Sequence, residues 1–238
     1  MTPLRGRLGS DGYPGTMRAM REQFHPPVED YLTTIYELSE DGINVIQARL
    51  AERLGHTPPA VSEMVTRLKT NGYLTISGRA ISLTEKGREL AEGVVRKHRL
   101  AERLLTDVIG LPWHLAHLEA GRWEHVISDE VEQRLRVLLD DPSTCPHGNP
   151  IPGSKPSLVR MVALSDAEPG DNVRLERVTE SVEIDNASMA YLHEHNFITG
   201  SVAKVTAKAP DGSLSLRVGR ETVVVGGLLG SNLYVSHA

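Results

Sequence analysis

Two short stretches of the sequence place histidine and carboxylate side chains at helical spacing. His98 and Glu102 are four residues apart, so on a helix they share one face and can reach one ion. A second group repeats the pattern at spacings of three and four: His117, Gly121, Glu124 and His125. One such pair also fits a surface ion pair, but two on consecutive predicted helices favour a divalent-metal site. Mixed imidazole and carboxylate ligands suit borderline or hard ions rather than thiophilic ones.

A second chemistry is carried by charge. The chain has a net charge of -5, yet between residues 44 and 88 seven basic residues stand against three acidic ones, a net of +4. Inside this window Thr57 is a good helix N-cap and Pro58 suits the first turn. A helix N-terminus favours phosphate, so the window is a candidate nucleic-acid surface. A solvated helix face of mixed charge is the alternative.

The elements around this window predict a helix-turn-helix followed by a hairpin. Apolar periodicity indicates helices over about 28–38, 45–54 and onward from residue 58, with turn signals at Asp41-Gly42 and Gly55. Asn71-Gly72 then leads into two expected strands, 73–76 and 80–83. This order is the winged-helix arrangement, and its third helix is sized for the major groove of DNA.

The remainder of the chain predicts a helical segment, a connector and a small barrel. Helices are expected over about 85–108, 113–128 and 129–139. Five prolines between residues 142 and 156 indicate a stiff, extended connector. Beyond residue 158 we expect strands over 172–177, 200–206, 213–218 and 222–225, with one short helix near 186–193.

Composition points to a cytoplasmic protein. No apolar run approaches the roughly 20 residues of a membrane-spanning helix, and the first residues lack the apolar core of a secretory signal. The one cysteine, Cys145, cannot form an internal disulfide, which favours a reducing compartment. Because Cys145 lies in the connector, away from the ligand helices, we expect an inert thiol rather than a metal ligand.

Four segments carry a resemblance to a known family: Tyr31 to Leu38 (YLTTIYEL), Arg96 to Leu105 (RKHRLAERLL), Arg122 to Glu132 (RWEHVISDEVE) and Gly148 to Gly153 (GNPIPG). They resemble the diphtheria-toxin-repressor family of iron- and manganese-dependent transcriptional regulators. The likeness runs from about residue 29 to residue 153 and weakens afterwards.

The resemblance implies a mainly α-helical protein with small β parts, in five successive segments. They are a disordered tail (1–24), a winged helix-turn-helix DNA-binding domain (25–92), a helical dimerisation and metal-binding domain (93–141), a Pro-rich linker (142–157) and an SH3-like barrel (158–238).

The family's two metal sites can be carried over residue by residue. The ancillary site implies His98, Glu102 and His117 with a barrel carboxylate at Asp185, and Ser188 stands where some members have Gln. The primary, activating site implies Asp30, Glu124 and His125. Gly121 stands where the family places Cys or Glu, so its backbone carbonyl or a water would have to serve. Asp30 is a hard donor typical of manganese-type members, which favours Mn2+ with Fe2+ close behind, while Co2+, Zn2+ and Ni2+ are possible in vitro.

The implied function is a metal-dependent repressor that binds double-stranded operator DNA as a homodimer and controls metal homeostasis genes. The expected reading residues begin the third helix: Thr57, Pro58, Pro59, Ala60, Ser62 and Glu63. The expected phosphate contacts are Arg49, Arg67 and Lys69. Two alternatives remain at this stage: a winged-helix regulator that has altered or lost metal control, because Gly121 offers no side chain, and a metal-dependent hydrolase.

Overall fold

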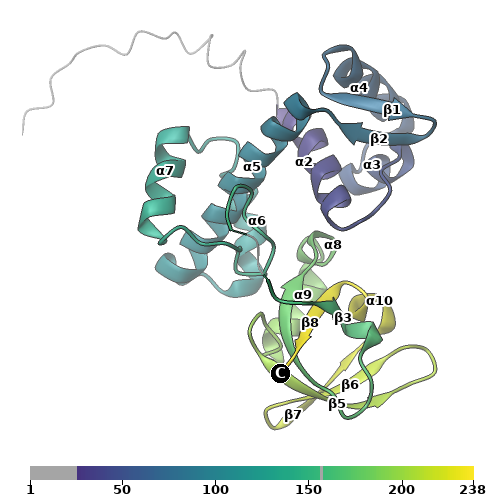
Figure 1. Cartoon of the computed structure of the whole chain (residues 1–238), viewed down its shortest axis with the longest axis vertical. Helices are drawn as coiled ribbons and strands as arrows, with labels where there is room; N and C mark the ends of the chain where they lie inside the picture. Colours follow the sequence, from purple (N-terminus) through teal and green to yellow (C-terminus); the bar gives the residue numbers. More distant parts are fainter. Residues whose placement is uncertain (1–25, 156–157) are drawn as a thin grey trace, which may run out of the picture.

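The computed structural model describes residues 26–155 and 158–238, so the tail predicted over 1–24 lies outside the described residues. Figure 1 shows three parts: residues 26–83, which end in a hairpin and which we call the reader domain, a group of helices around the long α5 (Glu85–Arg103), and a sheet-rich C-terminal part. In the described ranges, no helix combines the length and the apolar character needed to cross a membrane.

The reader domain has the predicted winged-helix order. Its elements are α2 (Pro26–Glu40), α3 (Gln47–Leu54), α4 (Pro58–Thr70), β1 (Leu74–Ser77) and β2 (Ala80–Leu83). Gly42 and Gly55 follow the first two helices at φ +72° and +65°, a conformation that glycine adopts without steric cost. The strands pair antiparallel from Leu74 opposite Leu83. The apolar faces of the three helices close one core around Leu32, Leu50 and Val65.

The helical domain follows the prediction except in its middle. The elements are α5 (Glu85–Arg103), a π-helical turn (Leu104–Ile109), a 3-10 turn (Trp113–Leu115), α6 (Ala116–Ala120) and α7 (Asp129–Leu138). The helix predicted over 113–128 is wrong, because it ends at Ala120 and residues 121–126 form turns. The Ala120 carbonyl accepts from both Trp123 and Glu124, which closes the helix at Gly121. Glu124 and His125 therefore lie on a turn, not on one helix face.

The C-terminal part is the expected small barrel, with more strands than predicted. Its strands are β3 (Val162–Ala163), β4 (Asn172–Val178), β5 (Val202–Lys208), β6 (Leu214–Val218), β7 (Glu221–Val225) and β8 (Leu233–His237), in the sheet order β3-β8-β4-β5-β6-β7. Short helices α8 (Glu180–Glu183), α9 (Asn186–Glu194) and α10 (Gly227–Gly230) connect them. Trp113 of the helical domain belongs to the barrel core, so the two parts share buried apolar surface.

The connector is compact, not extended as predicted. The backbone N–H of Cys145 donates to the carbonyl of Asn149 (2.8 Å), and the N–H of Gly148 donates to that of Cys145 (3.0 Å). The N–H of Val178 on β4 donates to the backbone carbonyl of His147 (2.8 Å), and the indole N–H of Trp113 donates to the backbone carbonyl of Pro146 (3.0 Å). These hydrogen bonds fold the connector between α5 and the barrel, and its prolines stiffen that turn.

Gly148 makes this packing possible. Its φ is +91°, and a Cβ built there would lie 1.9 Å from the carbonyl oxygen of Glu176. Gly148→Ala should therefore push the connector off β4 and lower the free energy of unfolding by roughly 2 kcal/mol or more, measured by denaturant titration. Gly170→Ala is the matched control, because Gly170 has φ +107° with open space around it. Equal losses from the two variants would show that the close approach to β4 contributes nothing.

Candidate metal centres

Three predicted ligands of the primary site meet between α2 and the turn after α6. We call Asp30, Glu124 and His125 the primary cluster. Nε2 of His125 lies 3.1 Å from Oδ1 of Asp30 and 3.1 Å from Oε1 of Glu124. One ligand atom from each residue lies within 4.8 Å of the others. The donors are two carboxylates and one imidazole, which suit a hard or borderline divalent ion.

Glu29 supports this cluster and was missed by the sequence analysis. Its Oε2 lies 2.7 Å from Nδ1 of His125, the nitrogen that faces away from Asp30. A carboxylate on the far nitrogen of a ligand histidine fixes the tautomer and the ring orientation. Spacing could not reveal Glu29, since it precedes Asp30 by one residue and lies 96 positions from His125.

Gly121 leaves the primary cluster without a fourth side chain, as the sequence indicated. Gly121 lines the same cleft as Asp30 and Glu124. Across the described part of the chain no backbone N–H donates to the Gly121 carbonyl, whereas the preceding carbonyl of Ala120 accepts two hydrogen bonds. A Cβ at Gly121 would approach its neighbours no closer than 3.7 Å, so the position has room for a side chain.

A second, deeper group lies where α5, α6, the connector and α8 meet. We call it the buried cluster, and its members are His98, Glu102, His117, Cys145, His147, Glu180 and Glu183. Nε2 of His98 lies 3.1 Å from Oε1 of Glu102 and 3.0 Å from Nδ1 of His117. His117 in turn lies 3.4 Å from Glu180 and 3.1 Å from Glu183. The three histidine and glutamate ligands predicted from the helices are therefore together.

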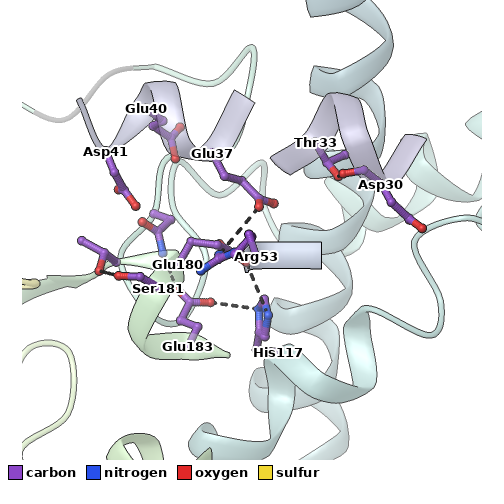
Figure 2. A network of polar contacts seen from close by, with 12 residues as sticks. Asp30, Thr33, Glu37, Glu40, Asp41, Arg53, His117, Glu180, Ser181 and Glu183 are labelled. Carbon is purple, nitrogen blue, oxygen red and sulfur yellow. Dashed lines mark hydrogen bonds and ion pairs between the residues drawn. The ribbon is translucent and has the colours of Figure 1, made fainter. Parts of the chain in front are cut away.

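The predicted barrel ligand is wrong. Asp185 is an exposed N-cap of α9 that accepts from the Ala187 N–H (3.2 Å), and Ser188 donates its hydroxyl to the same carboxylate (2.6 Å). The barrel carboxylates that reach the cluster are Glu180 and Glu183, on the preceding helix α8. Figure 2 shows Glu183 facing His117 from the α8 side. An (i, i+3) pair of acids was the available signal.

Cys145 and His147 also belong to the buried cluster, so the expectation that Cys145 lies away from the ligand helices is wrong. Nδ1 of His147 lies 3.3 Å from Glu102 and 3.1 Å from Glu183, and both connector side chains are fully buried. Neither Nδ1 of His147 nor Oε2 of Glu102 has a hydrogen bond of acceptable geometry in the described chain. Buried polar atoms without such partners are costly, so their convergence fits a cation.

Hydrogen bonds shift the pKa values of the primary cluster and its neighbours. Contacts with Asp30, Glu124 and Glu29 raise the pKa of His125 to about 11. Burial alone would raise the pKa of Glu124, but hydrogen bonds from His125 and His98 lower it to about 2. These contacts hold protons between ligand nitrogens and oxygens. A divalent cation that uses the same atoms must displace those protons, so metal affinity should rise with pH.

Burial and the neighbouring carboxylates shift the pKa values of the buried cluster. Burial opposes a charge on His98, yet the Glu102 and Glu124 carboxylates outweigh it and raise the pKa of His98 to about 10. Burial, followed by the nearby Glu102 and Glu183, raises the pKa of the Cys145 thiol to about 12. Buried carboxylates need a positive partner, which protonated imidazoles or a metal ion can provide.

His98 and a shared cleft connect the two clusters. Nδ1 of His98 lies 2.5 Å from Oε2 of Glu124, while Oε1 of Glu124 faces His125. A cleft of about 210 Å3 reaches members of both clusters, among them Asp30, Glu124, His117 and Glu180. Figure 2 shows that Glu37 and Arg53 of the reader domain also face this space. The two clusters are thus neighbours at a junction of all three parts of the molecule.

The residues predicted to contact DNA lie on α3, on α4 and just before α4 in the reader domain. All nine are exposed, while Val61, Val65 and Leu68 turn the other face of α4 into the core. In the described structure, the Thr57 hydroxyl makes no capping hydrogen bond to α4, so it remains free for another partner. Arg49 donates to the carbonyl of Asn44.

Comparisons with family descriptions cover most of the chain. "Iron dependent repressor, N-terminal DNA binding domain" matches residues 23–80. "Iron dependent repressor, metal binding and dimerisation domain" matches residues 84–153. "FeoA domain", an SH3-like fold, matches residues 162–237. The predicted fold class is therefore confirmed.

Individual proteins give the same result. The iron-dependent repressor IdeR of Mycobacterium tuberculosis (strain ATCC 25618 / H37Rv) is 45% identical over 203 residues, which cover 84% of this chain and 86% of the relative. The diphtheria toxin repressor of Corynebacterium diphtheriae is 41% identical over 198 residues, covering 79% and 87%.

A solved structure of a manganese-dependent transcriptional repressor in complex with manganese superposes with a TM-score of 0.79 at 28% identity, covering 89% of this chain and 100% of that one. The IdeR of T. acidophilum superposes with a TM-score of 0.71 at 26% identity, covering 88% and 97%. Sequence and structure therefore agree that the chain belongs to the family of iron-dependent repressors.

Proposed function

We propose that this chain is a cytoplasmic, metal-dependent transcriptional repressor that binds operator DNA as a homodimer when Mn2+ or Fe2+ is bound, and that it controls genes of metal homeostasis. It acts as a repressor and not as an enzyme, since the proteins it matches are repressors. The observation that carries the proposal is the approach of His125 to Asp30 across the boundary between the reader and helical domains.

The three parts have separate roles in this proposal. Residues 25–92 read DNA, and residues 93–141 form the dimer and hold metal ligands. Residues 158–238 contribute the carboxylates of α8 to the buried cluster, and the linker region 142–157 joins the barrel to the helical domain. Asp30 belongs to α2 of the reader domain, whereas Glu124 and His125 belong to the helical domain. By sharing one ion, these residues would fix the angle between the two domains and, in a dimer, the spacing of the two α4 helices. Operator half-sites require such spacing.

Metal binding and DNA binding are then linked. Asp30, Glu124 and His125 would hold the ion more tightly in the arrangement that fits DNA, which shifts the population toward that arrangement. The ion supplies positive charge that offsets the carboxylates and replaces the protons they now share with imidazoles. The hard donors favour Mn2+ or Fe2+ at the primary cluster, with Gly121 contributing its backbone carbonyl. Co2+, Zn2+ and Ni2+ are expected to bind in vitro.

The exposed start of α4 is the proposed reading surface. Thr57, Ser62 and Glu63 have side chains that can meet base edges or phosphate, and the amide groups at the helix start favour phosphate. Pro58, Pro59 and Ala60 would bring the backbone close to the groove. Glu63 can accept from the amino group of cytosine, which would bias operator choice. Arg49, Arg67 and Lys69 would contact phosphates on either side.

A DNA-binding titration tests the proposed function. Wild-type protein with Mn2+ should bind its operator, and a chelator should weaken binding by about tenfold or more, because coupling free energies of this kind lie in that range. His125→Ala should show the same loss in the presence of Mn2+, measured by fluorescence anisotropy. His195→Ala is the control, since its imidazole lies in the barrel beside Tyr191 (ring centroids 4.6 Å apart) and the exposed Glu221 (3.5 Å). Chelator-insensitive binding by the wild type would instead support the regulator that has lost metal control.

Gly121 allows a gain-of-function test of the primary cluster. Gly121→Glu adds a carboxylate where a Cβ meets nothing closer than 3.7 Å, so it should tighten Mn2+ binding several-fold by raising the ligand count. Gly121→Ala adds only the Cβ and should leave the Kd near the wild-type value. Competition with a metal-sensitive dye measures both. If Gly121→Glu leaves Mn2+ affinity unchanged while folding normally, Gly121 does not adjoin the activating site.

Cobalt spectroscopy tests the participation of Cys145. With Co2+ bound at the buried cluster, the thiolate should give a charge-transfer absorption in the near ultraviolet, because soft sulfur is a strong donor to this metal. Cys145→Ser should abolish the band, whereas His125→Ala, at the other cluster, should keep it. Identical cobalt spectra for wild type and Cys145→Ser would exclude the thiol from the ligands.

A further inference from the structure

The C-terminal end of α2, opposite the end that carries Asp30, contacts the barrel. Nη2 of Arg177, on β4, forms an ion pair with Oδ1 of Asp41, directly after α2. The same guanidinium nitrogen lies 3.7 Å from Oε2 of Glu40. The side chains of Arg177 and Asp41 are only 14% and 7% exposed, so water screens this pair weakly. Figure 2 shows Glu40 and Asp41 turned toward the side of the molecule that carries α8.

The other edge of the Arg177 guanidinium is connected to the buried cluster by hydrogen bonds through one intermediate residue, Asn149. Nε of Arg177 donates to Oδ1 of Asn149 at 2.5 Å. The Asn149 amide donates in turn to Oε1 of Glu183 and to the Val178 carbonyl (2.8 Å). Asn149 is 1% exposed. A continuous chain of hydrogen bonds therefore runs from Glu183 through Asn149 and Arg177 to Asp41.

Glu183 divides its two oxygens between two tasks. Oε2 faces the imidazoles of His117 and His147, each at 3.1 Å, whereas Oε1 accepts from Asn149. A cation that took Oε2 as a ligand would also fix the direction of Oε1. Movement of the carboxylate is therefore transmitted to Asn149, and hence to the edge of Arg177 that Asn149 holds.

A second arginine, Arg99, also pairs with a carboxylate at this end of α2. Arg99, which follows His98 on α5, donates to both oxygens of Glu40 at 3.1 and 2.6 Å. The buried Arg99 and the mostly buried Arg177, from different parts of the molecule, thus face two carboxylates of the reader domain. Removing one partner from such a group leaves an unpaired buried charge, which the fold tolerates poorly.

We infer that Arg177 is a positioning residue that couples the buried cluster to the reader domain, so that α2 is held at both ends: by Asp30 at the primary cluster, and by Asp41 and Glu40 through Arg177. The inference rests on the proposed function for its effect on DNA. The junction itself exists without it. The barrel then does more than lend ligands, because it orients the helix that leads into the DNA-reading elements.

Hydrogen–deuterium exchange tests the coupling without DNA. In wild-type protein, saturating Mn2+ should slow exchange at both ends of α2, near Asp30 and near Asp41. In Arg177→Gln, exchange near Asp41 should be faster without metal and should no longer respond to it, while the response near Asp30 persists. Arg174→Gln is the matched control, because Arg174 lies on the same strand and donates only to the exposed Gly200 carbonyl. Unchanged exchange near Asp41 in Arg177→Gln would overturn the inference.

Arg177→Lys distinguishes a loss of coupling from a general loss of folding in Arg177→Gln. Lysine keeps the charge beside Asp41 but lacks the fork that serves Asp41 and Asn149 at the same time. Exchange near Asp41 without metal should therefore stay close to the wild-type rate, while the slowing by Mn2+ should be lost. If Arg177→Lys retains the full response to Mn2+, Arg177 contributes only an ion pair with Asp41, and the proposed coupling is contradicted.

A double-mutant cycle measures the consequence for DNA. Arg177→Gln and Asp41→Asn should each weaken operator binding with Mn2+ by about fivefold to tenfold, and the double variant should be little worse than either, because the two side chains form one unit. Additive losses would contradict the coupling. If instead wild-type binding ignores metal while the exchange results hold, the proposed function fails and the positioning role of Arg177 stands.

Discussion

The regulatory account depends on one meeting of side chains, that of Asp30 from the reader domain with Glu124 and His125 from the helical domain. His125 lies within 3.1 Å of both carboxylates, and Glu29 supports its far nitrogen. Two carboxylates at one imidazole need positive charge, which a proton or a divalent ion can supply. Exchanging the one for the other is the chemical event from which a change in domain orientation can follow.

The junction of the three parts is held by charge as much as by apolar packing. The buried cluster collects three carboxylates, three imidazoles and a thiol from four segments of the chain. Such a network stabilises only the arrangement in which every partner is in place, because each unpaired buried charge is costly. The same property would make the junction respond to a bound metal ion. The compact connector, pinned to β4 by the close approach at Gly148, gives the network its fixed geometry.

The sequence predicted what depends on local pattern. The winged-helix order follows from the apolar periodicity of successive elements, and the pair of candidate ligands His98 and Glu102 follows from spacing within one helix. The helix expected through residue 128 ends at Ala120, because residues 121–126 fold into successive turns that the apolar pattern does not signal. Asp185 was assigned from the family resemblance, whereas the carboxylates that reach the cluster, Glu180 and Glu183, lie three residues apart on the four-residue helix α8. The roles of His147 and of Arg177, which pairs with a residue 136 positions away, arise from tertiary packing that spacing does not encode.

A crystal structure grown with Mn2+ and phased on its anomalous scattering tests the central claim most directly. The account predicts a manganese peak bonded at once to the carboxylate of Asp30, the carboxylate of Glu124 and Nε2 of His125. A peak confined to the buried cluster, or one at Glu124 and His125 with the Asp30 side chain turned away, would contradict it.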